Sequence, residues 1–186
     1  HTERRTPMAA LKASIMDGDT MRRTVRRISY EIIEKNKGTA DLCIIGIKRR
    51  GEVLAEMIAE NIRLSEGTDI PCGAVDVGFY RDDLGKMQEN PIVNGTDLTF
   101  DVAGKCIVLV DDVLYTGRTV RAAIEAIFSL GRPKAIRLAI LIDRGHRELP
   151  FRADYIGKSI PTSASERVAV MLPPYDDRTG VELYGE

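Results

Sequence analysis

The sequence predicts an α/β domain built on a mainly parallel β-sheet, and three observations support this prediction. The chain has 186 residues, of which 44% are hydrophobic, and this is enough for one domain with a full core. Short apolar runs typical of buried strands alternate with segments whose apolar residues recur at helical spacing. Such alternation is typical of parallel strands joined by right-handed crossovers through helices.

The N-terminal part is expected to contain a flexible segment and then a helix. Residues 1–18 are polar, so we expect them to precede the domain, which spans residues 19–186. The helix is predicted to begin at Asp19 or Thr20, because such side chains cap helix N-termini, and to be stopped by Lys37-Gly38. Its apolar stripe consists of Met21, Val25, Ile28 and Ile32.

The next elements are a strand, a helix and a second strand. Residues 42–47 (LCIIGI) are apolar throughout, as is typical of a parallel strand covered on both faces. A helix with its apolar stripe between residues 53 and 62 follows, and residues 72–79 are a further strand candidate. Residues 81–104 are polar and rich in Gly, Asn and Asp, which predicts a long irregular loop.

Polar residues follow two predicted strands in the second half of the chain. Residues 106–110 (CIVLV) form the most strand-like run, which is expected to stop at Asp111-Asp112. A helix is predicted at residues 120–128, and a strand at residues 135–142 leads into Asp143 and Arg144. In open parallel sheets ligands bind beyond the carboxyl ends of strands, so these positions are candidate sites.

The segment TGRT, residues 116–119, predicts a phosphate-binding loop. Gly117 allows close approach to a ligand, and amide groups at a helix N-terminus bind anions. Neither GxxxxGK[ST] nor GxGxxG is present. Asp111 and Asp112 are suited to accept hydrogen bonds from ribose hydroxyl groups, so the pattern indicates a sugar-phosphate site. The alternative for the two acids is a solvated turn after a strand.

Residues 108–119, VLVDDVLYTGRT, resemble the motif by which type I phosphoribosyltransferases bind phosphoribosyl pyrophosphate (PRPP). Together with four further segments, the motif resembles the family of bifunctional pyrimidine-operon attenuators and uracil phosphoribosyltransferases. The segments are GIKRRG (46–51), FYRDDL (79–84), DRGHRELP (143–150) and RADYIGKSIPTS (152–163). The resemblance implies a central, mainly parallel sheet flanked by helices, a flexible lid at about residues 81–104 and a small hood at about residues 150–175.

The resemblance also implies the roles of individual residues. Asp111, Asp112 and Arg81 are expected to be catalytic. The expected PRPP-binding residues are Arg49, Arg50, Asp111, Asp112, Val113, Leu114, Tyr115, Thr116, Gly117, Arg118 and Thr119. The expected uracil-binding residues are Asp143, Arg144, Ile156 and Val168. Surface charge is the alternative for Arg49 and Arg50, and an exposed loop is the alternative for the segment that contains Arg81.

Two histidines, three cysteines and no CxxC pair argue against a zinc site, so a metal is expected to be a hard, oxygen-bound cation. The resemblance implies Mg²⁺ held mainly through PRPP, without direct protein ligands. No apolar run is long enough to cross a bilayer and no secretion signal is evident, so a cytoplasmic protein is expected.

The formal net charge of −1 predicts that any contact with nucleic acid would use a local basic patch. The resemblance implies binding to the mRNA leader of a pyrimidine operon, controlled by UMP or UTP, by a homodimer or homotetramer. The candidate RNA-binding residues are Arg22, Arg23, Arg26, Arg27, His146, Arg147 and Lys158. A solvated helix face is the alternative for the arginines.

Two other functions remain open from the sequence. The chain is alternatively a non-catalytic regulator that senses PRPP or nucleotides and binds RNA. It is alternatively a phosphoribosyltransferase that salvages a purine or orotate and has no role in RNA binding.

Overall fold

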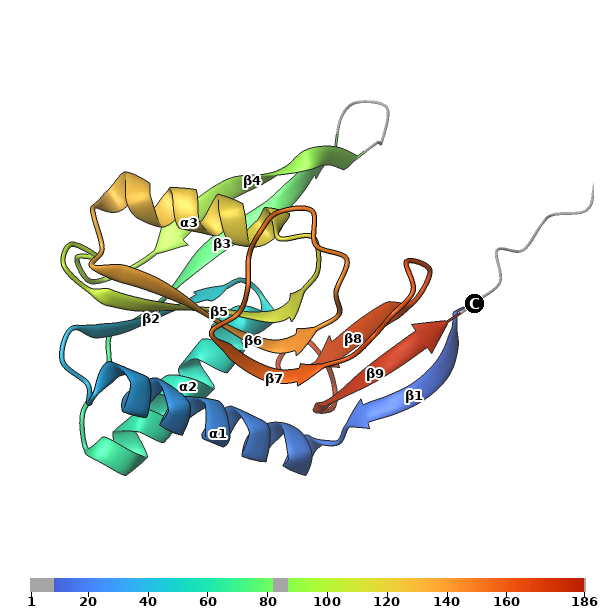
Figure 1. Cartoon of the computed structure of the whole chain (residues 1–186), viewed down its shortest axis with the longest axis horizontal. Coiled ribbons are helices and arrows are strands. Elements are labelled where there is room, and N and C mark those ends of the chain that lie inside the picture. The colour runs from blue at the N-terminus through green and yellow to red at the C-terminus, as the bar shows by residue number, and fades with distance from the viewer. Residues whose placement is uncertain (1–8, 82–86, 186) are drawn as a thin grey trace, which may run out of the picture.

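The computed structural model describes residues 9–81 and 87–185 and contains two β-sheets (Figure 1). The larger sheet has six strands in the order β4-β3-β2-β5-β6-β7, and all neighbours are parallel except β3 and β4. Its strands are β2 (Leu42–Ile47), β3 (Cys72–Arg81), β4 (Met87–Asp97), β5 (Cys106–Leu114), β6 (Ala135–Asp143) and β7 (Tyr155–Ser159). The prediction of a mainly parallel sheet is confirmed.

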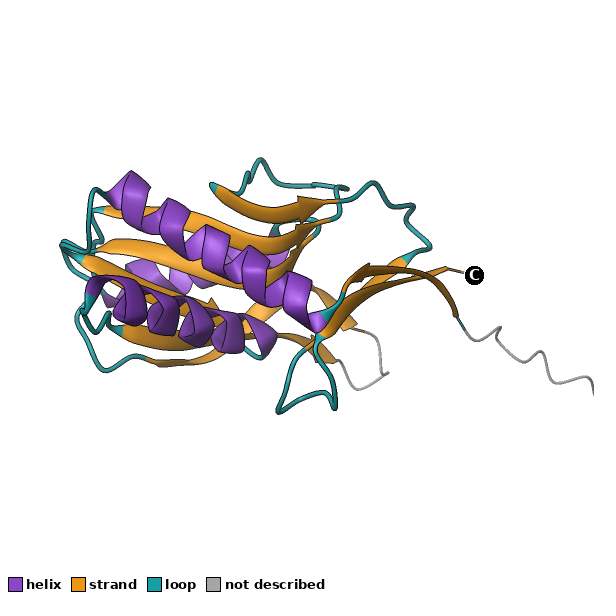
Figure 2. Ribbon diagram, turned by 90° about the horizontal axis from the view of Figure 1, so that it is seen from below, coloured by secondary structure: helices purple, strands orange, loops and turns teal. Residues whose placement is uncertain are grey.

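Three helices cover the two faces of this sheet and bury its apolar side chains. Helices α1 (Gly18–Asn36) and α2 (Arg50–Glu66) lie side by side on one face, as Figure 2 shows from below. Helix α3 (Arg118–Leu130) lies on the other face (Figure 1). Each face has its own hydrophobic core, and successive residues of β2 and β5 alternate between them. Strands covered on both faces must be apolar throughout, which explains why LCIIGI and CIVLV were recognisable.

Helix α1 begins earlier than the sequence indicated. Its N-cap is Asp17, whose carboxylate accepts a hydrogen bond of 2.7 Å from the amide of Thr20. Asp19 and Thr20 therefore lie inside the first turn, and the prediction that one of them caps the helix is wrong. The helix ends at Asn36, and its C-cap Lys37 is in a left-handed conformation, which agrees with the predicted stop at Lys37-Gly38.

The hood is a second sheet that includes residues expected to be flexible. Strand β1 (Ala10–Met16) pairs antiparallel with β9 (Gly180–Gly185), which pairs antiparallel with β8 (Arg167–Met171). Residues 10–16 are thus ordered, contrary to the prediction for residues 1–18; residues 1–8 lie outside the described part of the chain. The predicted hood range of 150–175 omits β1 and β9, which belong to the hood sheet. It also includes β7, which belongs to the larger sheet.

The expected irregular loop of residues 81–104 contains a regular strand. Strand β4 pairs antiparallel with β3, with Val77 opposite Val93 and Arg81 opposite Met87. The prediction that this segment lacks a packed element is therefore wrong, because backbone pairing does not require apolar side chains. Residues 82–86 lie outside the described residues, as does the side chain of Arg81, so the predicted lid and its catalytic arginine remain predictions.

Strands β5 and β6 extend further than predicted. Strand β5 continues through Asp111 and Asp112 to Leu114, and β6 includes Asp143. The prediction that the first strand stops at the acid pair is wrong, because Asp111 pairs in register with Ile140 and Val113 with Ile142. Within the described residues, no helix is both long and apolar enough to traverse a bilayer.

Candidate active site

Two adjacent carboxylates lie near the end of β5. Asp111 is only 8% exposed, and its Oδ1 accepts a hydrogen bond of 2.8 Å from the amide of Asp112. Oδ1 of Asp112 accepts a bond of the same length from the amide of Val113. Burial, together with the neighbouring Asp112 carboxylate, raises the pKa of Asp111 well above its usual range. The surroundings of Asp111 thus disfavour its charged form, and carboxyl groups with pKa values perturbed in this way are often found at functional sites.

Helix α2 approaches β5 closely just after two consecutive arginines. A Cβ atom added to Gly51 would lie 2.6 Å from the carbonyl oxygen of Val110 and 3.1 Å from Cα of Asp111. Only glycine fits at this contact. Arg49 and Arg50 immediately precede it, at the N-terminus of α2, and the peptide bond between Lys48 and Arg49 is cis.

The predicted phosphate loop runs from β5 into α3. Gly117 has φ of 95°, a left-handed conformation that favours glycine, and is the N-cap residue of α3. Thr116 Oγ1 accepts a hydrogen bond of 3.2 Å from the amide of Arg118. Free amide groups of a first helical turn point along the helix axis and bind anions, so the loop has the geometry predicted for a phosphate cradle.

The segment 144–149 wraps around the outside of this loop. The amide of Arg144 donates to the carbonyl of Leu114 at 3.1 Å, and those of Glu148 and Leu149 donate to the carbonyl of Thr116 at 2.9 and 3.0 Å. Glu148 also forms an ion pair with Arg118 through Nε at 2.8 Å. These bonds connect the turn after β6 with the loop after β5, so the turn after β6 helps to fix the conformation of residues 114–116.

Arg147 belongs to this wrapping segment. Its Nε donates to the carbonyl of Phe151 at 2.9 Å, its Nη1 to that of Tyr115 at 2.8 Å and its Nη2 to Asp143 at 2.6 Å. All three nitrogens are used within the protein. This geometry favours a structural role over the predicted RNA contact. His146 is exposed, but its Nε2 lies 2.6 Å from the carbonyl oxygen of Thr162.

The loop after β8 reaches the arginines of α2. Asp176 binds Arg50 with both oxygens, at 3.0 Å to Nε and 3.0 Å to Nη2, and also accepts from the amide of Leu172 at 2.8 Å. The guanidinium carbons of Arg49 and Arg50 each lie 5.9 Å from the centroid of the Tyr175 ring. The bonds to Arg50 lower the pKa of Asp176, and the pKa of Arg50 is raised by the same bonds and, to a smaller extent, by Asp112.

Replacing Asp176 with Asn is expected to destabilise the protein by about 1–2 kcal/mol at neutral pH, since the charge-assisted bonds to Arg50 are removed. The folded-state pKa of Asp176 is depressed, so its contribution is present above the ordinary pKa and is lost as pH falls through the folded value. Thermal unfolding between pH 2 and 7 tests this. Wild type and Asp176→Asn should converge at acidic pH, and a gap that stays constant would contradict the assignment.

The predicted uracil-binding residues do not converge as side chains. Asp143 accepts from Arg147 and from the amide of Gly145, and Arg144 is buried. Ile156 lies in β7, where it packs against the core on the α3 side, whereas Val168 lies in β8 of the hood and packs against the other core. Their role in binding a base remains a prediction, and it would rest on main-chain groups.

The four arginines of α1 have different surroundings. Arg22 forms an ion pair with Asp19 at 2.5 Å, and Arg27 binds Glu31 at 2.8 Å and the carbonyls of Ile156 and Gly157. In contrast, Arg23, Arg26 and Lys158 are exposed, and none of them has an ion-pair partner in the described ranges. Because Arg27 ties α1 to β7, Lys158 lies beside this helix.

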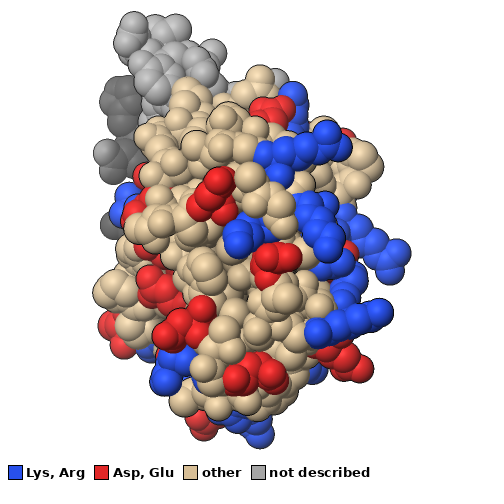
Figure 3. Space-filling view, turned by 90° about the vertical axis from the view of Figure 1, so that its left-hand side faces the viewer, with Lys and Arg blue, Asp and Glu red and all other residues tan. Residues whose placement is uncertain are grey.

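Basic side chains are not confined to α1. Figure 3 views the end of the molecule where the parallel strands begin, opposite the acid pair, and shows Lys and Arg mostly along one side. Acidic side chains are spread over the remainder of this face. This mixture fits the formal net charge of −1, so positive charge alone does not single out one binding surface.

Several residues that shape the site were not predicted from the sequence. Asp176 and Tyr175 lie more than one hundred residues from their arginine partners, as the separation of 126 between Arg50 and Asp176 shows. Glu148 and Gly51 likewise act through tertiary contacts. The one local signal available was the position of Gly51, directly after two arginines and at the start of a helix.

Comparison with known protein families and curated proteins yields a consistent result. The profile of the family "Phosphoribosyl transferase domain" matches residues 13–177. The chain is 58% identical over 163 residues to "Bifunctional protein PyrR" of Caldicellulosiruptor saccharolyticus, covering 88% of this chain and 90% of that protein. It is 57% identical over 176 residues to the protein of the same name from Pelotomaculum thermopropionicum, covering 95% and 97%.

Solved structures with a similar fold include other phosphoribosyltransferases. A hypoxanthine-guanine phosphoribosyltransferase from Bacillus anthracis superposes with a TM-score of 0.72 at 17% identity, covering 96% of this chain and 100% of that one. A purine phosphoribosyltransferase from Pyrococcus horikoshii gives a TM-score of 0.58 at 27% identity, covering 74% and 80%. The first similarity is one of fold alone, and it matches the fold expected from the sequence.

Proposed function

Because the chain belongs to the phosphoribosyl transferase domain family, and within it to the family of bifunctional PyrR proteins, we propose that it converts uracil and PRPP to UMP and pyrophosphate and also regulates a pyrimidine operon. The observation that carries the catalytic half is the juxtaposition of Asp111 and Asp112 with the TGRT loop. This pair lies near the carboxyl end of β5, and proteins built on parallel sheets bind ligands at that end of the strands.

In the proposed reaction the 5′-phosphate lies in the loop of residues 116–119 and the ribose hydroxyls face the acid pair. The carboxylates of Asp111 and Asp112 would stabilise positive charge that develops on the sugar as the bond to pyrophosphate breaks. Arg49 and Arg50 lie at the N-terminus of α2, directly before the contact of Gly51 with β5, and would bind the leaving pyrophosphate, for which planar guanidinium groups are well suited. No protein nucleophile is required when the base attacks the sugar directly.

The donor set at this site fits Mg²⁺. Asp111 and Asp112 offer carboxylate oxygens, the ligand type that this hard cation prefers, and PRPP would supply further oxygens. When bound, Mg²⁺ would neutralise charge on the pyrophosphate. We propose that Mg²⁺ is held mainly through PRPP. We also propose that the protein acts in the cytoplasm, because its proposed partners are the highly charged PRPP and an mRNA.

A direct test is PRPP-dependent turnover with uracil, hypoxanthine, guanine, adenine and orotate as competing bases. We expect UMP formation to exceed formation of any other nucleotide by at least about 100-fold in kcat/KM. Preference for a purine or for orotate would replace the proposal with the salvage alternative. PRPP binding without turnover of any base would favour the non-catalytic regulator.

For regulation, we propose that Arg23, Arg26 and Lys158 contact phosphates of the mRNA leader when UMP or UTP is bound, with a homodimer or homotetramer presenting the surface. The support is that these cations are exposed and that none of them forms an ion pair within the described residues. Arg22 and Arg27 contribute less in this proposal, since both already pair with acids.

The double substitution Arg23→Glu and Arg26→Glu is expected to weaken binding to the leader RNA and to reduce the salt dependence of affinity, by about one unit of slope for each phosphate that the variant no longer binds. Filter binding over a range of salt concentrations measures both. UMP formation should stay unchanged, and Arg63→Glu on α2 serves as a matched surface control. Equal weakening by the control, or equal affinity for a scrambled RNA, would contradict the proposed surface.

A further inference from the structure

Arg144 is a buried arginine whose contacts join two separate parts of the site. It is 8% exposed, although a guanidinium group is costly to bury without partners. Its Nη2 donates to the carbonyl oxygens of Ser163 at 3.1 Å and Glu166 at 2.9 Å. Both acceptors lie in residues 160–166, which connect β7 to β8 and are called the hood loop below.

The flat face of the same guanidinium lies against the phosphate-binding loop. Its Cζ is 4.1 Å from the centroid of the Tyr115 ring, close enough for a strong cation–π contact. The rings of Tyr115 and His146 form a T-shaped contact, with 5.7 Å between their centroids. Tyr115 is thus held on one face by Arg144, while its carbonyl is held by Arg147.

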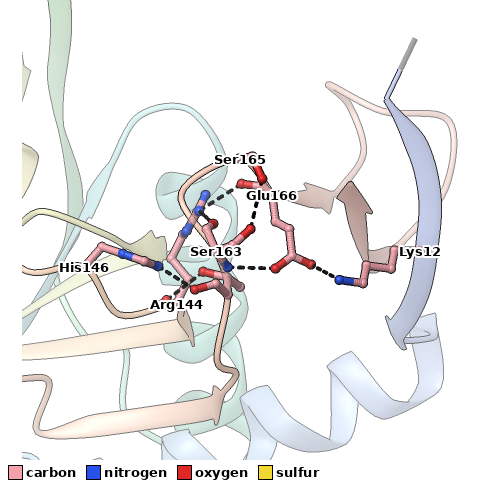
Figure 4. A network of polar contacts seen from close by, with 7 residues as sticks. Lys12, Arg144, His146, Ser163, Ser165 and Glu166 are labelled. Carbon is pink, nitrogen blue, oxygen red and sulfur yellow. Dashed lines mark hydrogen bonds and ion pairs between the residues drawn. The ribbon is translucent and has the colours of Figure 1, made fainter. Parts of the chain in front are cut away.

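The hood loop is itself braced from both sides, as Figure 4 shows. Glu166 accepts from the amide of Ser163 at 2.7 Å and forms an ion pair of 2.7 Å with Lys12 on β1. These bonds lower the pKa of Glu166 to about 2, so the brace persists throughout the neutral range. Thr162 additionally donates from its hydroxyl to the carbonyl of Arg144 at 2.9 Å.

A cavity of about 380 Å³ lies between the turn after β6 and the start of the hood loop, lined by residues 143–147 and 159–162. This volume is within the range of small-molecule sites. Arg144 forms part of its wall, but its Nη2 is already bonded to the protein, and its buried Nε has no hydrogen-bond partner among the described residues. Nη2 therefore fixes the guanidinium group to the hood loop, whereas Nε is not paired within the described residues.

We propose that Arg144 is a positioning residue that locks the hood loop onto Tyr115, so that the space for the base and the loop that holds the sugar phosphate stay in fixed register. This inference rests on the proposed phosphoribosyl transfer and adds a positioning role to the predicted uracil contact of Arg144. Correct placement matters because the reacting atoms must approach to about 3–3.5 Å, and an error of about 1 Å lowers the rate about 100-fold.

The test uses Arg144→Lys, which keeps the charge but removes both the planar stack and the forked donor. We expect kcat/KM for uracil to fall about 100-fold, while the Kd for PRPP, measured by calorimetry, changes less than about threefold. Tyr115→Leu should reproduce this loss, and the double variant of Arg144→Lys with Tyr115→Leu should be no worse than either single one. Arg63→Lys, in a bidentate surface pair with Glu60, is the matched control.

Hydrogen exchange of amides in the hood loop gives a readout that does not depend on turnover. Arg144→Lys and Tyr115→Leu should each accelerate exchange in residues 160–166 about tenfold while leaving the amides of β2 unchanged. Additive losses in the double variant, or a parallel loss of PRPP affinity, would overturn the inference, as would unchanged exchange. If wild type fails to use uracil, the proposed function fails, whereas the exchange data still decide whether Arg144 couples the two loops.

Discussion

Asp111→Asn is expected to lower kcat/KM for UMP formation about 100-fold and, at the same time, to raise the melting temperature of the PRPP-free protein. The loss of activity follows from removing a charge that faces the developing positive charge on the sugar. The gain in stability follows from burial, because an uncharged amide of the same shape avoids the cost of ionising a buried carboxyl group beside Asp112.

The stability difference should depend on pH in a defined direction. Burial raises the folded-state pKa of Asp111, so its favourable contribution is fully present below the ordinary pKa and is lost as pH rises through the folded value. The difference in melting temperature between Asp111→Asn and wild type should therefore increase toward alkaline pH in thermal unfolding scans. Asp69→Asn, at an exposed position, is the control and should change neither quantity. A variant that keeps its activity, or that melts below wild type at all pH values, would refute this account.

Gly51→Ala is expected to destabilise the protein strongly and to weaken PRPP binding. The added Cβ would lie 2.6 Å from the carbonyl oxygen of Val110, and this backbone atom cannot move away without displacing β5 from its neighbours. Overpacking of this kind costs about 3 kcal/mol. Because the same methyl group presses on Asp111, PRPP affinity should fall at least about tenfold in molecules that remain folded.

Gly95→Ala is the matched control, since an added Cβ there meets no atom within 4 Å and the residue is not in a left-handed conformation. Urea unfolding of both variants and calorimetric titration with PRPP measure the two effects. Equal stability of Gly51→Ala and Gly95→Ala would show that α2 moves freely against β5. The acid pair would then not depend on this contact.

Elements covered on both faces were predictable because their signal is local. LCIIGI and CIVLV are apolar at every position, and α3 shows an apolar stripe followed by Gly131. The phosphate loop was predictable for a similar reason, since Gly117 in a left-handed conformation and the start of a helix depend on a few adjacent residues. The extension of β5 through Asp111 was missed, because polar residues within a strand look like its end.

The sequence by itself determined the α/β class, the alternation of strands and helices, and the turn at Gly117 that leads into α3, because short-range patterns encode all three. The tertiary structure alone decided that β1 pairs with β9, that Asp176 holds Arg50 and that Arg144 lies between Tyr115 and the hood loop. Lys12 and Glu166, for example, are separated by 154 residues. Contacts between residues so far apart in the sequence depend on how the helices and strands pack in three dimensions, and local sequence periodicity does not encode that packing.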